Sequence, residues 1–373
     1  DGWGDLLSIQ YGKSPKAILS ATGCYPVWGT GGVTGKTYEY LHEGDSIVIG
    51  RKGTIDKPQF VTGKFWVIDT AYYASNFNGC LPKWLYYAIL NLGIKKYNES
   101  TGVPSLNRET IYSISSLHPP LQEQKKIAEI LTSVDVVIEK TEAQISKLRD
   151  LKKAMMTELL TKGIGHTEFK DSPVGRIPAA WKVFPLGGIS QYINGHVFKP
   201  GSWTDKGYQI IRIQNLNGGT DFNCYNGIVD ENWMVESGDL LFAWSGQRGK
   251  SFGARIWNGS KGVLNQHIFK VISDERYVTK AFLHSKLQQI QVELEAKAHG
   301  FKDSFMHVKK GEITAYQVAL AGKKEQEKIV GILSSIERCY DCAVKKLTQT
   351  KTLKKALMHD LLTGKKRVKV AAD

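Results

Sequence analysis

The sequence has no run of 18 apolar residues, so it predicts no helix long enough to cross a membrane. Its five cysteines are odd in number and scattered over 373 residues, which argues against a disulfide framework and favours reduced thiols in the cytoplasm. Cys339 and Cys342 lie three residues apart in a stretch expected to be helical, without a partner pair, so we expect them to pack rather than bind metal. The chain begins at Asp1 rather than at methionine, which leaves a cleaved leader open.

Recognisable catalytic motifs are also missing. The nine histidines lie apart without HExxH spacing, and no GxSxG elbow occurs. The stretch "GTGGVTGKT" (29–37) resembles a phosphate-binding loop, but its spacing fails by one residue and no helix is expected to follow. We therefore expect no catalytic site, no metal and no cofactor in this chain, although an enzyme with an unfamiliar site stays open.

Charge of one sign is in excess. Lysine and arginine number 50 against 36 acidic residues, a formal net charge of +14. This excess favours a polyanionic partner such as nucleic acid, while anionic membrane surfaces and acidic proteins attract the same charge. With 42% apolar and 23% charged residues, the chain is long enough for two globular domains with cores of their own.

Two stretches of the chain repeat one another, one near the middle and one near the C-terminal end. Residues 123–161 align without a gap with residues 325–363, and 15 of the 39 positions are identical. Identity gathers at the ends, where "EQKKIAEILTS" faces "EQEKIVGILSS" and "LKKAMMTELLT" faces "LKKALMHDLLT". The repeat predicts two equivalent helices of about 39 residues, each roughly 58 Å long.

An apolar seam runs along both stretches at steps of three and four residues, which is typical of a coiled coil. Thr141, Lys152, Thr350 and Lys354 interrupt the seam. We expect the two helices to pair antiparallel, while a parallel pair, or two unrelated helices in separate cores, are the alternatives. The seam positions are Ile127, Leu131, Val134, Ile138, Ile145, Leu148, Met155, Leu159, Ile329, Leu333, Ile336, Tyr340, Ala343, Leu347, Leu357 and Leu361.

The segments before the two helices also match. "EGDSIVIGRKG" at Glu43 is similar to "SGDLLFAWSGQRG" at Ser237, each a Gly-Asp turn, an apolar strand and a glycine-rich basic loop. The predicted plan is a globular domain at 1–118, a helix at 119–165, a second globular domain at 166–322 with an entry linker at 166–186, and a helix with a basic tail at 323–373. The fold class is α/β (α+β) with an internal repeat.

These features together resemble the specificity subunit of type I restriction-modification systems. The resemblance rests on "PPLQEQKKIAEIL", "LKKAMMTELLTKGIG", the "IPAAW" linker and the second "EQEKIVGIL…LKKALMHDLLTG", and it covers almost the whole chain. It implies two target-recognition domains on two antiparallel helices, double-stranded DNA with a bipartite target, and two modification (methyltransferase) subunits with restriction subunits as partners. Methylation and cleavage would belong to those partners. Because the first half begins abruptly at "DGWGDLL", we expect the family's entry segment to be cut off there.

The candidate DNA contacts lie in loops containing glycine or proline, where a backbone can approach DNA closely. Guanidinium and amide groups can bond guanine and adenine edges. For each residue a solvated surface role is the alternative, whereas Asn265, Gln266 and His267 and the tryptophans at 28, 66, 233 and 244 are expected to be structural. The candidates are Lys36, Arg51, Lys52, Lys57, Ser105 and Asn107 in the first domain and Arg212, Gln214, Asn215, Gln247, Arg248 and Lys250 in the second.

The repeated helix ends are candidates for docking two identical subunits, because a duplicated chain presents each surface twice. Capping and solvation of the helices is the alternative interpretation. The candidates are Glu123, Gln124, Lys152 and Lys153 with Glu325, Gln326, Lys354 and Lys355. The competing functions are a coiled-coil scaffold that does not read DNA and the specificity module of a related type II (IIB/IIG-like) system.

Overall fold

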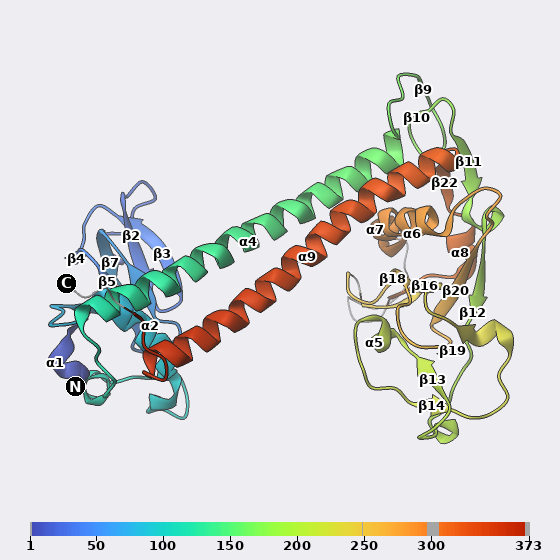
Figure 1. The fold of residues 1–373 in the computed structure, drawn as a ribbon. Helices are drawn as coiled ribbons and strands as arrows, with labels where there is room; N and C mark the ends of the chain where they lie inside the picture. The colour runs from blue at the N-terminus through green and yellow to red at the C-terminus, as the bar shows by residue number, and fades with distance from the viewer. Residues whose placement is uncertain (1, 248, 297–305, 370–373) are drawn as a thin grey trace. The chain divides into compact units, whose positions relative to one another are not determined.

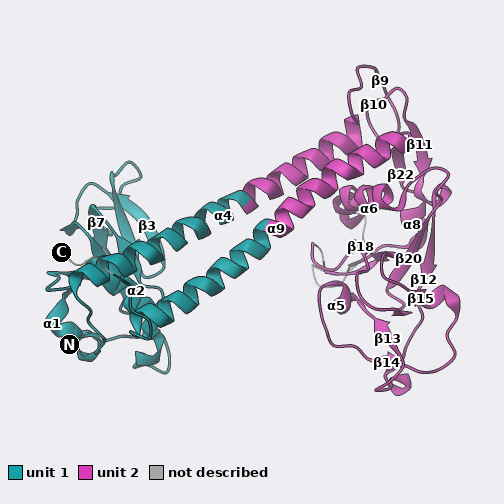
Figure 2. Ribbon diagram, viewed as in Figure 1, with its two compact units in different colours: residues 1–144, 343–373 teal, residues 145–342 magenta. Residues whose placement is uncertain are grey.

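The computed structural model describes residues 2–247, 249–296 and 306–369, and it divides into two compact units (Figure 2). Unit 1 comprises residues 1–144 and 343–373, and unit 2 comprises residues 145–342. Two long helices, α4 (Leu121–Lys162) and α9 (Lys323–Leu362), each contribute one part to each unit (Figures 1 and 2).

Both units contain the same pair of four-stranded sheets. In unit 1 the strand orders are β1-β8-β5-β6 and β3-β2-β7-β4, and in unit 2 they are β12-β20-β16-β18 and β14-β13-β19-β15. In each unit the central pair of the second sheet, β2 with β7 and β13 with β19, is parallel, whereas the other pairs are antiparallel. The duplication expected from the sequence is therefore a duplication of topology.

The strands of unit 1 are β1 (Ser8–Tyr11), β2 (Tyr25–Gly29), β3 (Gly32–Thr37), β4 (His42–Glu43), β5 (Ser46–Gly50), β6 (Gln59–Val61), β7 (Lys64–Val67) and β8 (Ala71–Ser75). Its shorter helices are α1 (Trp3–Leu6), α2 (Pro82–Leu92), η1 (Ile94–Tyr97) and α3 (Arg108–Ser113).

The strands of unit 2 are β9 (Phe169–Lys170), β10 (Ile177–Pro178), β11 (Lys182–Pro185), β12 (Ser190–Asn194), β13 (Tyr208–Ile211), β14 (Cys224–Tyr225), β15 (Met234–Val235), β16 (Leu240–Ala243), β17 (Ser245–Gly246), β18 (Gly253–Ile256), β19 (Gly262–Leu264), β20 (Ile268–Ser273), β21 (Met306–His307) and β22 (Gln317–Leu320). Its shorter helices are η2 (Leu186–Gly188), η3 (Pro200–Ser202), α5 (Ile213–Leu216), η4 (Glu231–Trp233), α6 (Lys280–Gln289), α7 (Gln291–Ala296) and α8 (Lys310–Thr314).

A glycine directly follows β1 in unit 1 and its counterpart β12 in unit 2, and the backbone around each leaves no room for a side chain. A β-carbon on Gly12 would lie 2.1 Å from the Ile68 carbonyl oxygen, and one on Gly195 would lie 2.2 Å from that of Asn265. Any side chain would force these backbones apart, because real β-carbons do not approach oxygen so closely. The expected Gly-Asp turns are also present, since Gly44 and Gly238 adopt φ values of +120° and +91° directly before the buried strands β5 and β16.

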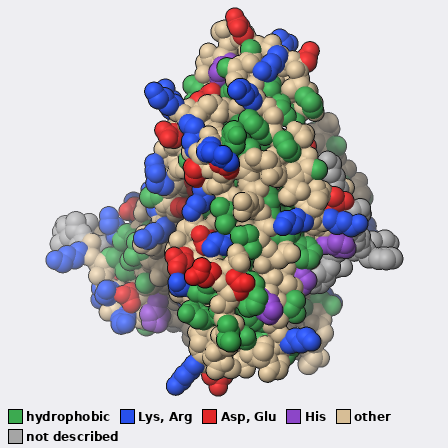
Figure 3. Space-filling model, turned by 90° about the vertical axis from the view of Figure 1, so that its right-hand side faces the viewer, with side chains coloured by type: hydrophobic (Ala, Val, Ile, Leu, Met, Phe, Trp, Pro, Cys, Tyr) green, Lys and Arg blue, Asp and Glu red, His purple; other side chains and the backbone are tan. Residues whose placement is uncertain are grey.

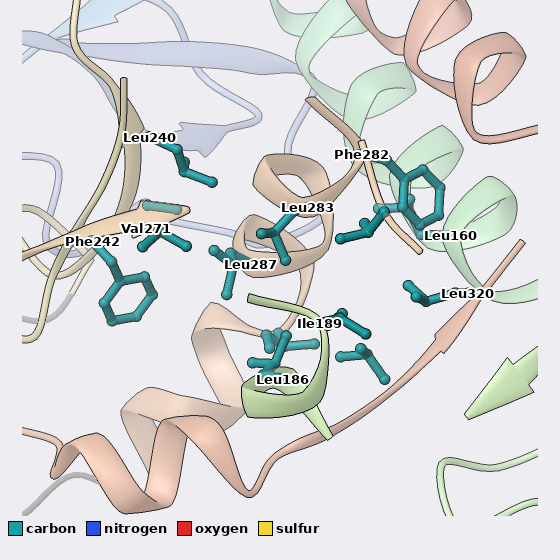
Figure 4. Close-up of a cluster of buried hydrophobic side chains, with 14 of the residues drawn as sticks. Leu160, Leu186, Ile189, Leu240, Phe242, Val271, Phe282, Leu283, Leu287 and Leu320 are labelled. Carbon is teal, nitrogen blue, oxygen red and sulfur yellow. The ribbon is translucent and has the colours of Figure 1, made fainter. Parts of the chain in front are cut away.

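Each core forms where one helix of the domain packs against its sheet and against both long helices. In unit 2, Phe282, Leu283 and Leu287 of α6 meet sheet residues and Leu160 of α4 (Figure 4). In unit 1, the equivalent helix α2 packs with Ile127 and Leu131 of α4 and with Leu361 of α9. The long helices are thus part of both cores rather than appendages.

Within each unit the two long-helix segments run antiparallel, as expected. In unit 1, Lys354 pairs with Asp135 at 2.6 Å and Lys351 pairs with Glu142 at 2.6 Å, so positions rise along one helix as they fall along the other. In unit 2, Lys152 pairs with Glu337 at 2.7 Å. Every predicted seam position is buried or half-buried. Lys152 and Lys354, which interrupt the seam, form ion pairs with the opposite helix.

Candidate nucleic-acid interface

In unit 1, two loops carrying four of the predicted DNA contacts lie against each other. The Arg51 carbonyl accepts from Leu106 N at 2.9 Å, Gly53 N donates to the Pro104 carbonyl at 2.8 Å, and Lys52 forms an isolated bridge with Ser105. The loop after β5 is thereby joined to the segment that enters α3. This brings together Arg51, Lys52, Ser105 and Asn107, of which Lys52 and Asn107 are exposed.

An aromatic ring flanked by two arginines completes this surface. The guanidinium carbons of Arg51 and Arg108 lie 5.3 Å and 5.5 Å from the centre of the Tyr11 ring, which is 47% exposed. Arg51 also donates to the Asp69 carbonyl at 3.2 Å, which holds its side chain in place. Sequence reasoning missed Tyr11 and Arg108; the only signal was an aromatic residue directly before "GK" in "SIQYGK".

The remaining candidates of unit 1 lie on the neighbouring hairpin and loop. Lys57 is exposed in the loop that ends at β6, where Gln59 Nε2 donates to the Gly29 carbonyl at 3.1 Å and ties this loop to the β2–β3 turn. Lys36 is exposed on β3, and its carbonyl accepts from Ser20 N. The Asn107 side chain accepts from Glu109 N at 2.8 Å, so this residue also caps α3.

In unit 2, the segment after β16 pairs with a second segment as the loop after β5 does in unit 1, but the residues differ. We call these two paired segments of each unit its loop pair. Strand β17, directly after β16, pairs with β21, with Ser245 opposite His307. The loop that follows closes on itself, since Gln247 N donates to Ser251 Oγ at 2.7 Å and the Gln247 carbonyl accepts from Ser251 N. The Gln247 and Lys250 side chains are exposed, and Arg248 lies outside the described residues.

The three candidates around α5 have distinct environments. Gln214 is exposed, and the Arg212 guanidinium lies 5.1 Å from the centre of the Trp203 ring. Asn215 is 6% exposed, donates both amide hydrogens to the carbonyls of Gly219 and Asp221, and accepts from Arg212 N. Its donors are used within the loop, so Asn215 shapes this surface and has no amide hydrogen left for a base.

The residues expected to be structural are buried or half-buried. Trp66 and Asn265 are 8% and 9% exposed, and Trp28 and Trp244 pack against buried core residues. Burial lowers the pKa of His267, which keeps its ring neutral near pH 7. Across the face in Figure 3, lysine and arginine side chains are spread out rather than gathered in one patch, and acidic side chains gather near its centre.

The repeated "EQ" pairs hold internal contacts in both units. Gln124 accepts from Leu81 N at 2.8 Å and donates to the carbonyls of Pro119 and Gly79. Gln326 accepts from Thr279 N at 2.9 Å and donates to the carbonyls of Tyr277 and Ala321. Leu81 and Thr279 are the residues directly before α2 and α6, so each glutamine anchors its long helix to the domain helix.

The two glutamates bind the segment that follows the other long helix. In unit 1, Arg367 donates to Glu123 at 2.5 Å, and this hydrogen bond lowers the pKa of Glu123. In unit 2, Glu325 accepts from Ile164 N at 2.9 Å and Trp181 Nε1 at 3.1 Å and lies 2.8 Å from His166 Nε2.

The candidate docking residues differ in exposure and in contacts. Glu123, Gln124 and Gln326 are at most 4% exposed, which favours the structural interpretation for them. Lys153 and Lys355 are exposed, and Lys152 and Lys354 are held in ion pairs.

Within the described residues, no group of three or more histidine, cysteine, aspartate or glutamate side chains is arranged to hold a metal ion. The same part of the chain contains no helix that is both long and apolar enough to span a membrane.

The chain is thus a duplicated protein of two units with one topology, each presenting exposed basic and amide side chains that are suited to contacts with DNA. The family model for the type I restriction modification DNA specificity domain matches residues 3–149 and 178–352. The chain therefore belongs to the family of type I restriction-modification DNA specificity subunits, and the resemblance found in the sequence is confirmed.

Individual relatives agree with this assignment. The MjaVIII specificity subunit of Methanocaldococcus jannaschii is 28% identical over 290 residues, covering 74% of this chain and 68% of that protein. The putative MjaX specificity subunit of the same organism is 29% identical over 311 residues, covering 79% and 70%.

Solved structures show the same fold. The S subunit of a type I restriction-modification system from M. genitalium has a TM-score of 0.66 at 15% identity, covering 97% of this chain and 95% of that chain. A chain from a structure of the type I R-M system described for complex assembly and conformational transition has a TM-score of 0.55 at 14% identity, covering 98% and 97%.

Proposed function

We propose that each unit reads one half of a bipartite DNA target and that the two long helices set the distance between the halves. The observation that carries this proposal is the loop pair after β5 and β16, which has one architecture and two sets of side chains. Arg51 and Lys52 in unit 1 correspond to Ser245 and Gly246 in unit 2, followed by the exposed Gln247. Different donors at equivalent places read different bases, so the two half-sites differ.

The helices act as a spacer in this proposal because their residues are shared by both cores. A helix rises about 1.5 Å per residue, so the separation of the DNA-reading surfaces follows from helix length. DNA turns once in about 34–36 Å, and the unread gap between half-sites is then a geometric property of the protein.

We further infer that the chain itself is non-catalytic and acts in the cytoplasm with two modification subunits and with restriction subunits. The exposed Lys153 and Lys355 occupy equivalent places in the repeat, which suits docking of two copies of one partner. The buried Glu123, Gln124 and Gln326 support such a surface indirectly by fixing each long helix against its domain.

Selection from a random pool of double-stranded DNA tests the proposal. The purified chain, with its modification subunits, should enrich two short unlike motifs separated by a fixed number of unread base pairs. One continuous motif, or enrichment without sequence preference, would contradict it. Incubating the chain alone with DNA and labelled S-adenosylmethionine should transfer no methyl group, and turnover would overturn the non-catalytic assignment.

A further inference from the structure

A group of equivalent positions beside the long helices is filled by side chains in unit 1 and surrounds a cavity in unit 2. Each unit has an equivalent ion pair between its segments of α4 and α9. Asp135 with Lys354 in unit 1 corresponds to Glu337 with Lys152 in unit 2, because residues 123–161 align with 325–363.

In unit 1, the Tyr87 side chain contacts both members of this ion pair. The Tyr87 hydroxyl donates to Asp135 Oδ2 at 2.7 Å, and Lys354 Nζ lies 5.5 Å from the centre of the Tyr87 ring. A second cation, Lys83, lies over the rings of Phe60 and Tyr86 at 4.0 Å and 5.4 Å. The ammonium groups of Lys83 and Lys354 therefore each lie near an aromatic ring. This cation–π arrangement is attractive, and more so when the ammonium group and the ring are shielded from water.

In unit 2, the equivalent side chains are smaller or charged. The residues directly before α2 and α6, Leu81 and Thr279, are matched by their bonds to Gln124 and Gln326, so positions on the two helices correspond at an interval of 198. Lys83, Tyr86 and Tyr87 are thereby replaced by Ala281, His284 and Ser285. Phe60, opposite Ile47 in its sheet, is replaced by Arg255, opposite Leu241.

These replacements leave a cavity of about 550 Å³ between α6, β18 and the unit 2 segments of α4 and α9. Ser285 is too short to repeat the contact of Tyr87, and its hydroxyl donates to the Ala281 carbonyl instead. In the described part of unit 2, neither Lys152 nor Arg255 has an aromatic ring within cation–π distance. The lining includes Lys152, Met156, Arg255, His284, Ser285 and Glu337.

We propose that this cavity is a binding site for a phenol ring, carried as a tyrosine side chain by a protein segment. The ring would face Lys152 and Arg255, and its hydroxyl would donate to Glu337 as the Tyr87 hydroxyl donates to Asp135. The two cations and the acceptor are already present, and the ring is the part that unit 1 has and unit 2 lacks. Burial lowers the pKa of His284 to about 4, so its ring adds no charge to the cavity at neutral pH.

The test is a titration of the full-length chain with p-cresol, the side-chain analogue of tyrosine, followed by NMR. We expect one saturable site in the wild type, loss of that site in Ser285→Tyr, and retention in the control Ser335→Tyr, which changes an exposed serine outside the cavity lining. Toluene, which has the ring without the hydroxyl, should bind more weakly. Absence of saturable binding, or equal binding by Ser285→Tyr, would overturn the proposal.

Two further measurements use a variant of unit 1 and a second ligand. Tyr87→Ser should open the matching space in unit 1 and give a second p-cresol site, and a folded variant without one would contradict the equivalence of the two positions. If Ser285→Tyr fails to fold, His284→Tyr fills the same space and should likewise lose the site. N-acetyltyrosine amide should bind as p-cresol does. Binding of p-cresol without binding of N-acetyltyrosine amide would contradict a protein segment as the source of the ring.

Discussion

Replacing Gln326 with methionine tests whether the repeated glutamines hold the long helices to their domains. Methionine has nearly the same length and no hydrogen-bonding amide, so the change removes polar contacts with little change in volume. Gln326 is completely buried and makes three hydrogen bonds to backbone groups at 2.8 to 2.9 Å.

The expected loss follows from these three bonds. Each contributes a net of about 1 kcal/mol, and leaving a buried donor or acceptor unpaired adds to the cost, so Gln326→Met should lower the free energy of unfolding by roughly 3 kcal/mol. Gln124→Met should do the same for unit 1, because its completely buried side chain makes the corresponding contacts.

Urea unfolding followed by circular dichroism measures both losses. The matched control is Glu327→Gln, which changes an exposed neighbour of Gln326 and should alter stability by less than about 0.5 kcal/mol. A loss below about 1 kcal/mol in both methionine variants would refute the anchoring role, and the "EQ" repeat would then need another explanation.

Three other predictions follow from particular residues. Burial lowers the pKa of Lys286 from 10.5 to about 7, so between these two pH values the unfolded protein binds more protons than the folded protein. The protein's free energy of unfolding should therefore rise with pH in this range by up to about 1.4 kcal/mol per pH unit. Lys286→Met should lack that rise in pH-dependent urea titrations. Replacing Arg51 and Lys52 with alanine should reduce the slope of log affinity against log salt by about 1 for each phosphate group that the variant no longer neutralises, whereas Lys140→Ala on an exposed part of α4 should leave it unchanged. Inserting seven residues after Gln144 and after Cys342, which preserves the heptad seam, should change the preferred gap without changing the half-site bases; altered half-sites in a DNA selection would contradict the division of roles.

The sequence predicted the long helices well because their signal is periodic and repeated. Ile127 and Ile329 sit at the same place in both copies, and both are almost fully buried. The Gly-Asp turns before β5 and β16 were also predictable, since a glycine that adopts positive φ leaves a local signature.

The contacts of the site were harder to predict because they join residues distant in sequence. Nothing in "EQ" reveals that Gln124 reaches back to Leu81, or that Glu325 binds Trp181 across 144 positions. Asn215 looked like a base reader, but an asparagine after a strand can equally satisfy a loop's own carbonyls, and only three-dimensional structure distinguishes the two.

The surface around Tyr11 shows the same limit. Its two flanking arginines come from positions 51 and 108, and the three residues meet because β1 pairs with β8 and the α3 segment returns to the loop after β5. Single-residue patterns carry no record of such pairing.

DNA selection with unit-specific variants tests the central claim most directly. The assembled protein carrying Arg51→Ala and Lys52→Ala, and separately one carrying Gln247→Ala and Lys250→Ala, would be presented with the same random pool as the wild type. We expect each variant to relax base preference in one half-site only, and in opposite halves, with the gap unchanged. Loss of preference in both halves from either variant would contradict that claim.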